Sequence, residues 1–385
     1  MTIDATTIRG ARQSRSNEET NEPGSFRRKG DFLRGPYVVG VLLLTLIGVF
    51  RYLGISLRFQ GLTFFGLYLS IAIQSTAYTM VLIALQYPSE LFVPGLRRII
   101  NRPELILAGL ALGFLFFRLL PIGFAIPALV AVLFLFAIPL HKISKVLVPG
   151  LYLFVGLLTA FGFNVAVVTV RFEPNYDQVL QKVDQVLLFG HSVSELSHQF
   201  AASVPHFVPG ALLVWYALMF PQIGAALMLC STFISREYAM RFVSAILVAY
   251  ALSVAIFFAF PTHSPYFSCV GHISAGFPAA MVQIQEQFVR TATARFHGLR
   301  APLGPEYYIS FPCMHIAQPL IAMWFLRRWR RMLIFLGIVN LILIFAIVIL
   351  EWHYFADIIG GIVLAAISVW LVDVRIRRPG LTAVA

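Results

Sequence analysis

Charged residues are scarce in this sequence. Asp, Glu, Lys and Arg make up 12% of the 385 residues, whereas hydrophobic residues make up 59% and the mean hydropathy is +0.82. A soluble domain needs more polar surface than this chain can supply. The composition therefore excludes a soluble protein and predicts an all-α integral membrane protein.

Cysteine is also rare. The three cysteines, Cys230, Cys269 and Cys313, include no CxxC pair, so the sequence predicts neither a disulfide framework nor a closed metal site. Cys269 and Cys313 could pair outside the membrane, but free thiols are the favoured interpretation. The nine histidines offer only one clean two-ligand spacing. We therefore predict no metal and no cofactor.

The first 35 residues contain arginine, lysine and glutamate but no apolar segment. We expect residues 1–35 to form a disordered basic tail in the cytoplasm, and the first membrane span to serve as the insertion signal. The net charge of +12 could suggest nucleic acid as a partner. However, the basic residues form short clusters beside apolar runs, which is typical of membrane topology and argues against nucleic acid binding.

The apolar runs predict ten transmembrane helices, at about 20 residues for each crossing. They lie near residues 36–56, 61–86, 104–120, 121–140, 147–170, 208–232, 242–260, 310–326, 332–350 and 352–374. We divide them into an N-terminal membrane region of four spans at 36–146 and a six-helix core at 147–375. Residues 376–385 form a second cytoplasmic tail.

Every second connection between these spans is basic. The clusters are Arg97, Arg98 and Arg102; His141, Lys142 and Lys145; Arg236 and Arg241; residues 327–331; and residues 375–378. The positive-inside rule places these connections and both termini in the cytoplasm. The two long connections, 171–207 and 261–309, then lie outside. A bacterial inner membrane is the expected location.

Two histidine motifs interrupt the hydrocarbon-like runs on this outer side. SFPCMH at 310–315 and EWHYFAD at 351–357 each stand where a span begins, so His315 and His353 are expected to meet. His353 and Asp357 have the i, i+4 spacing that places two side chains on one helix face. Ionisable groups at membrane depth are costly and therefore indicate function.

This arrangement suits phosphate chemistry. Helix N-termini favour anions, with Ser310 as a cap and Pro312 in the first turn. Asp357 can accept the Nδ1 proton of His353, which leaves Nε2 free to attack phosphorus, and His315 can protonate the leaving oxygen. Gly360 and Gly361 would allow close helix packing that holds the site.

The two motifs resemble those of the type 2 phosphatidic acid phosphatase superfamily. SFPCMHIA at 310–317 and HYFADIIGG at 353–361 are similar to the FPSxH and HHYxxD motifs of its inositol phosphorylceramide synthase-like branch, and PTHSPYF at 261–267 is similar to a preceding segment. The resemblance covers about residues 147–375. It implies that His353 is the nucleophile, Asp357 its orienting partner and His315 the acid.

The sequence also departs from the phosphatase members of this superfamily. The Ser-Arg pair that precedes their last histidine is Ala346 and Ile347 here, and the Arg-Pro at 102–103 falls on the cytoplasmic side. This loss of cations favours the synthase-like branch. The predicted replacements, which would bind phosphate from the outer loop, are Arg290, Arg295 and Arg300, with Arg171 and Lys182 behind them.

The resemblance implies a phosphotransferase that moves a phosphorylated head group, such as inositol phosphate, between a lipid donor and an acceptor through a phosphohistidine. One alternative is a phosphatase for lipid phosphates or polyprenyl diphosphates, in which water is the acceptor. A lipid transporter is less favoured, because few charges occur deep in the other spans. Lipid phosphates and membrane lipids are the expected partners.

The outer connection at 171–207 alternates apolar and charged residues. Val179, Val183, Val186 and Leu187 recur at helical intervals, which predicts an amphipathic helix on the membrane interface. Such a helix could cover the site and guide lipid, or it could only join two spans.

Overall fold

A computed structural model describes residues 75, 78, 79, 81–83, 140–170, 176–267, 277–297 and 309–374. All of them belong to one compact unit, Thr45–Ala385. Regular structure within the described residues is entirely helical, which confirms the all-α class. The predicted spans before residue 140 lie almost wholly outside the described residues, and with them the count of ten helices.

Each of the six spans predicted after residue 146 coincides with one or more helices in the structure. Their elements are α7 (Leu140–Val170), α10 (Phe207–Ala217), α11 (Met219–Leu229), η1 (Cys230–Ile234), α12 (Arg236–Ala259), α14 (Met314–Phe325), α15 (Arg330–Ile349), α16 (Phe355–Val369) and η3 (Trp370–Val374). Among the described residues, five stretches are long and apolar enough to cross a membrane: Lys145–Val168, Phe207–Ile234, Arg236–Ala259, Arg330–Ile349 and Phe355–Asp373.

The sixth, α14, is shorter than predicted. Its 12 residues extend about 18 Å, less than the roughly 30 Å of a bilayer core. It begins at Met314 rather than near Ser310, because the Ser310 hydroxyl bonds to Asp357 instead of capping the helix. The prediction that Ser310 caps this helix and Pro312 enters its first turn was therefore wrong.

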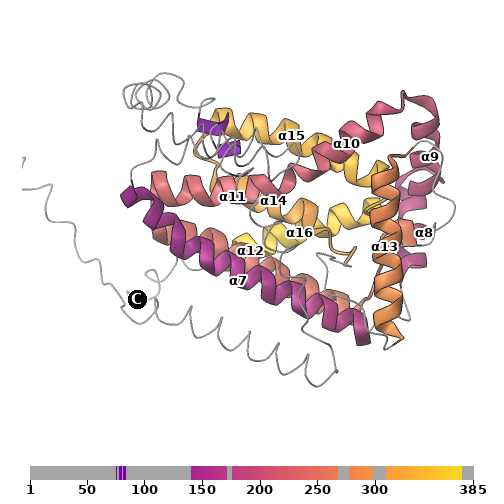
Figure 1. The fold of residues 1–385 in the computed structure, drawn as a ribbon, viewed down its shortest axis with the longest axis horizontal. Helices are drawn as coiled ribbons and strands as arrows, with labels where there is room; N and C mark the ends of the chain where they lie inside the picture. The colour runs from indigo at the N-terminus through magenta and orange to yellow at the C-terminus, as the bar shows by residue number, and fades with distance from the viewer. Residues whose placement is uncertain are drawn as a thin grey trace, which may run out of the picture. The chain divides into compact units, whose positions relative to one another are not determined.

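Long apolar helices pack side by side around α14. Helix α14 lies between α12 and α16, α12 also packs along α7, and α10 packs along α15 (Figure 1). The indole N–H of Trp215 in α10 donates to the Val339 carbonyl of α15 over 2.9 Å. The outward faces of α15 and α16 carry exposed Ile334, Ile338, Leu341, Phe345, Ile359, Ile362, Val363 and Ile367. A wholly apolar exposed stripe of this kind suits contact with lipid.

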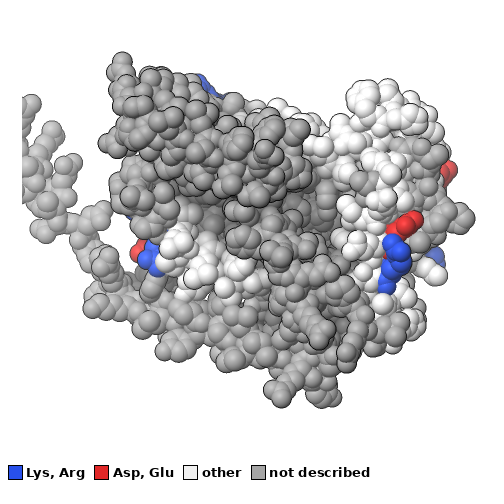
Figure 2. All heavy atoms as spheres, viewed as in Figure 1, with Lys and Arg blue, Asp and Glu red and all other residues white. Residues whose placement is uncertain are grey.

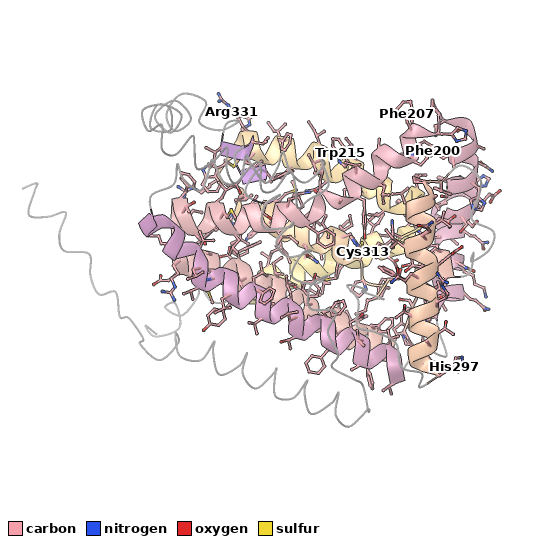
Figure 3. The ribbon with its side chains drawn as sticks, in the orientation of Figure 1. Phe200, Phe207, Trp215, His297, Cys313 and Arg331 are labelled. Atoms are coloured by element: carbon pink, nitrogen blue, oxygen red, sulfur yellow. The ribbon has the colours of Figure 1, made fainter. Side chains whose placement is uncertain are left out.

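Charged side chains lie near the ends of these helices. In Figure 2 the visible Lys, Arg, Asp and Glu spheres lie toward the left, right and upper edges of the view. Asp373, near the end of η3, accepts hydrogen bonds from Arg241, Arg327 and the Trp324 indole. The basic connections after α11 and α14 therefore meet at one end of the helices, and Figure 3 shows Arg331 at that end, far from Phe207.

Three further helices lie at the opposite end. They are α8 (Asp177–Leu187), α9 (Val193–Ser203) and α13 (Ala279–Phe296), with the turn η2 (Pro265–Phe267) between them in sequence. Helix α8 contacts α16, α9 contacts α15, and α13 contacts α7. In Figure 1, α13 runs across the ends of the long helices. The end of the bundle at which α14 and α16 begin is thus covered.

The described part of the connection at 171–207 contains two helices rather than one, and the apolar face of α8 points outward. Val179, Val183 and Val186 are 47%, 40% and 80% exposed, whereas Asp177 and Asp184 are buried. An outward apolar face agrees with a helix that rests on a membrane interface. The protein-facing side of α8 is instead built around two carboxylates.

Candidate active site

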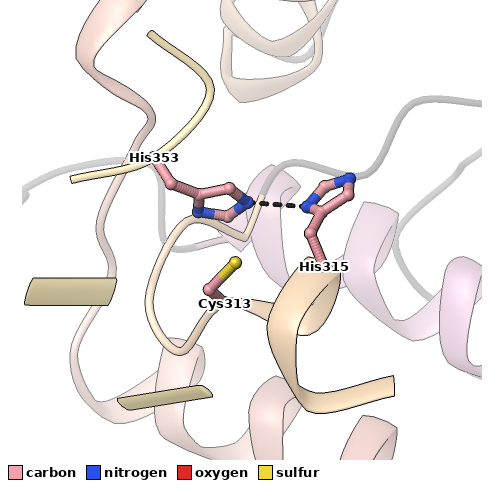
Figure 4. Close-up of side chains that lie close together, drawn as sticks. All are labelled: Cys313, His315 and His353. Carbon is pink, nitrogen blue, oxygen red and sulfur yellow. Dashed lines mark hydrogen bonds between the residues drawn. The ribbon is translucent and has the colours of Figure 1, made fainter. Parts of the chain in front are cut away.

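The two histidines of the sequence motifs face each other. His315 is the second residue of α14, and His353 lies in the turn at residues 350–354 that precedes α16. The Nδ1 atom of His315 is 2.7 Å from the Nε2 atom of His353 (Figure 4). Residues 38 positions apart in sequence are thus joined directly, as their predicted placement at one membrane face required.

A single chain of hydrogen bonds runs through both imidazoles. His353 Nδ1 is 3.1 Å from Asp357 Oδ2, and His315 Nε2 is 2.8 Å from the Tyr216 hydroxyl. With Asp357 ionised, His353 must donate from Nδ1, so its Nε2 has no proton and accepts from His315 Nδ1. His315 Nε2 then accepts from Tyr216. With both imidazoles neutral and Asp357 ionised, the chain therefore has one consistent direction, from Tyr216 to Asp357.

Asp357 is held by three further groups. The Ser310 hydroxyl and the Tyr354 backbone N–H both donate to Oδ2, the latter over 2.9 Å, and the Asp357 carbonyl accepts from the Cys313 N–H over 3.1 Å. These bonds fix the carboxylate relative to both motifs. Ser310 thus binds the Asp357 carboxylate rather than capping a helix.

The N-terminus of α16 is closed by a second carboxylate. Asp184 of α8 accepts from the backbone N–H groups of Phe355 and Ala356 over 2.9 and 2.8 Å. The expectation that this helix start offers donors to phosphate is therefore wrong, because Asp184 and Asp357 already use them. The start of α14 differs, since no side-chain cap bonds to it among the described residues.

The PTHSPYF segment supports the first motif. Thr262 Oγ1 accepts from the Phe311 N–H over 3.1 Å, and the Thr262 carbonyl accepts from the Ser310 N–H. His263 is in turn held by Asp177 of α8, which accepts from its backbone N–H over 2.6 Å and lies 3.2 Å from its Nδ1. Helix α8 therefore braces both motifs, through Asp184 and through Asp177.

The turn that carries His353 is tied down from two sides. Ser197 of α9 donates to the Ile349 carbonyl, and Gln285 of α13 donates to the Leu350 carbonyl over 2.9 Å. Trp352 stacks on Tyr216, with ring centroids 5.3 Å apart. The covering helices and α10 thus hold the turn in place, as precise alignment of reacting groups requires.

Glu351 in the same turn is buried beside His198, with Oε1 and Nε2 3.4 Å apart. Burial raises the pKa of Glu351 to about 7, and burial raises the pKa of Asp184 to about 6. Glu351 also has φ of +59°, a conformation that L residues adopt rarely. The turn therefore contains both an uncommon backbone geometry and a carboxyl group that titrates near neutrality.

The predicted close packing at Gly360 and Gly361 is confirmed. A Cβ at Gly361 would lie 2.5 Å from the Cys313 carbonyl oxygen, and one at Gly360 would lie 2.5 Å from the Phe311 ring. Both distances are shorter than real Cβ contacts. Only glycine allows α16 to approach the SFPCMH motif this closely.

Residues 178–371, from α8 to η3, match the PAP2 superfamily. The match covers half of the chain and contains both histidine motifs. The chain belongs to the PAP2 superfamily. No curated protein and no solved structure matches the chain.

Membership in the PAP2 superfamily indicates phosphatase or phosphotransferase chemistry on lipid phosphates. The matched residues include α8 and α9, so the covering helices belong to the PAP2 region together with the membrane helices. The predicted N-terminal membrane region at 36–146 lies outside the match.

Within the described part of the chain, the structure does not bring the predicted phosphate-binding arginines to the two histidines. Arg290 is exposed on α13, and its Nε donates to the Glu286 carbonyl of its own helix. The side chain of Arg295 and the whole of Arg300 lie outside the described residues. Their role as a phosphate clamp stays a prediction.

Two side chains in the site were not predicted from the sequence. Tyr216 stands in the apolar run LLVWYALMF, where nothing distinguishes it from a packing aromatic. Asp184 lies on α8, for which the sequence predicted an amphipathic interfacial helix but no contact with the histidine motifs. Its only signal is the i, i+7 spacing from Asp177, which repeats an acidic group on one side of α8.

Proposed function

We propose that this protein is a phosphotransferase that moves a phosphorylated head group, of the inositol phosphate type, from a lipid donor to an acceptor through a phosphohistidine at His353. The observation that carries the proposal is the directed chain from Tyr216 through His315 and His353 to Asp357. It leaves His353 Nε2 without a proton and places the His315 Nδ1 proton directly opposite.

The first step follows from this arrangement. A phosphate group that enters between the imidazoles replaces their mutual hydrogen bond, and its negative charge favours uptake of a proton by His315, from solvent or from the phosphate itself, so that both nitrogens of this ring carry a proton. His353 Nε2 then attacks phosphorus as the bond to the leaving oxygen breaks, and His315 Nδ1 gives that oxygen its proton. Asp357 stabilises the positive charge that forms on the His353 ring.

The second step reverses these roles. His315, now without a proton on Nδ1, accepts one from the acceptor hydroxyl, whose oxygen attacks phosphorus. The bond between phosphorus and Nε2 breaks, and His353 returns to its starting state. If water is the acceptor, the same site is a lipid phosphatase, which is the second candidate and is supported by the same superfamily match.

The positive-inside pattern supports an active site on the extracytoplasmic face, with a bacterial inner membrane as the location. The exposed valines of α8 and Phe189, which is 96% exposed, support entry of substrate from the lipid surface. A transporter is less supported, because both histidines are engaged in a chain suited to proton transfer.

The test uses purified protein in detergent with a panel of lipid phosphates. We expect wild type to acquire the mass of the phosphorylated head group on histidine, labile in acid, and to transfer it faster when an acceptor alcohol is added; the mass of a phosphoryl group alone would indicate hydrolysis of a monoester or diphosphate. His353→Ala and Asp357→Ala should lose turnover while retaining wild-type thermal unfolding. Normal turnover in His353→Ala would refute the mechanism, and phosphate release without acceptor dependence would assign the phosphatase.

A further inference from the structure

A buried thiol lies beside the two imidazoles. Cys313 is fully buried and makes no disulfide. One ligand atom from each of Cys313, His315 and His353 lies within 4.8 Å of the other two, and the imidazoles meet through His315 Nδ1 and His353 Nε2 (Figure 4). One sulfur and two nitrogen donors from the two motifs therefore form a potential set of metal ligands. The proposed reaction uses the two imidazoles but binds no metal and does not use the thiol.

We propose that Cys313, His315 and His353 bind a thiophilic divalent cation of the Zn²⁺ type, and that this cation blocks the His353 nucleophile. Binding itself is independent of the proposed function, whereas the inhibition rests on it. Thiolate and imidazole are the ligands that Zn²⁺ prefers, whereas Mg²⁺ and Ca²⁺ prefer oxygen.

The two nitrogen ligands require only a small adjustment. Two nitrogens bound to one tetrahedral Zn²⁺ at about 2.0–2.1 Å stand about 3.3 Å apart, compared with 2.7 Å between the imidazoles here. The rings therefore separate by about 0.6 Å. A fourth coordination position remains for water or for a phosphate oxygen.

The protons can also be accounted for. Cys313 releases its thiol proton to solvent when sulfur binds the cation. His315 must free Nδ1, and its proton moves to Nε2, where the Tyr216 oxygen can accept the new hydrogen bond in place of donating one. His353 Nε2 already has no proton. Its lone pair, which would attack phosphorus, is then engaged by the metal.

The first experiment measures binding without activity. Chelator-treated protein in detergent is titrated with Co²⁺ as a spectroscopic probe, and Cys313→Ser is compared with Cys230→Ser, which removes another buried free thiol. We expect wild type and Cys230→Ser to show a thiolate-to-cobalt charge-transfer band that Zn²⁺ abolishes. Absence of the band in wild type, or its persistence in Cys313→Ser, would overturn the site.

A thermal unfolding measurement covers the case in which Cys313→Ser folds poorly. Zn²⁺ should raise the Tm of wild type and of Cys230→Ser, because a ligand that binds only the folded state stabilises it. Cys313→Ala should lose this increase. An equal increase in Cys313→Ala would place the metal elsewhere and overturn the site.

The second experiment measures inhibition. Zn²⁺ should abolish lipid phosphate turnover by wild type, chelator should restore it, and Cys313→Ser should require at least about 10-fold more Zn²⁺, each variant being compared with its own metal-free rate. Activation by Zn²⁺ would overturn both the inhibition and the role of His353. A protein that binds Co²⁺ through Cys313 but never turns over would refute the proposed function alone.

Discussion

Replacing Gly361 by Ala should separate the two histidine motifs. The new methyl group would lie 2.5 Å from the Cys313 carbonyl oxygen and 3.1 Å from the Ile316 Cβ. The first neighbour is a backbone atom and the second is the branched carbon of a residue in the first turn of α14, so neither can rotate away. Normal van der Waals contact at about 3.5 Å requires α16 to move by roughly 0.5–1 Å.

The magnitude follows from two opposing effects. Overpacking of a tight contact costs about 1–3 kcal/mol, whereas alanine in place of glycine adds up to about 1 kcal/mol of helix propensity. We therefore expect a net loss of about 1–2 kcal/mol in the free energy of unfolding. The motion also lengthens the 2.7 Å contact between His315 and His353, and misalignment of about 1 Å can cost about 10²-fold in turnover.

The measurements are thermal unfolding in detergent and turnover per folded molecule. Gly337→Ala on α15 is the matched control, because its Cβ would meet only Met323 Cε, at an ordinary 3.9 Å. We expect the control to unfold at the same temperature as wild type or higher, with normal turnover. If Gly361→Ala also behaves like wild type, the close approach does not hold the site together, and the reasoning is refuted.

Three further changes test the surroundings of the site. Tyr216→Phe removes the donor to His315 Nε2 and should lower kcat roughly tenfold and alter the pH–rate profile, with KM unchanged; an unaltered profile would leave Tyr216 as packing only. Burial raises the pKa of Glu351 from 4.5 to about 7, so the folded protein holds this proton more tightly than the unfolded chain does. The free energy of unfolding should therefore fall as pH rises from about 4.5 to 7, by about 3 kcal/mol at most. Glu351→Gln should match wild type in Tm at pH 4.5 and exceed it at pH 8; an equal pH dependence in both would contradict this. Arg290→Ala should retain turnover, because Arg290 is exposed. Arg295→Ala or Arg300→Ala should lose about 10²-fold in turnover if that arginine binds phosphate. Normal turnover after all three arginines are changed to Ala would place the phosphate-binding cations elsewhere.

Residue spacing predicted the centre of the site well. The i, i+4 relation of His353 and Asp357 is a local property, and the structure joins them over 3.1 Å even though His353 precedes α16. The contact between His315 and His353 could be predicted because every second span begins on the same membrane face, and both motifs stand at the start of such a span. Their catalytic roles stay predictions, as does the identity of the lipid.

The outer helices show how far such reasoning reaches. The valine spacing predicted an amphipathic helix on the membrane interface, and in α8 the valines are exposed while Asp184 is buried against α16. The spacing gives the two faces of the helix, but it does not say which partner the polar face meets. The contact between Asp184 and the start of α16 could therefore not be found from the pattern alone.

The distribution of charge around the histidines defines what the reaction still needs. Asp184 and Asp357 are buried and occupy the donors at the start of α16, so that end of the site repels an anion rather than attracting it. The start of α14 and the protons of the two imidazoles are the positive elements that the described residues supply. A phosphate carrying one or two negative charges must therefore bring a proton to the His315–His353 pair or meet cations from the outer loop. In either case the cause is the same: because two carboxylates hold the turn of His353 and the start of α16, the charge of the substrate has to be balanced from the opposite side.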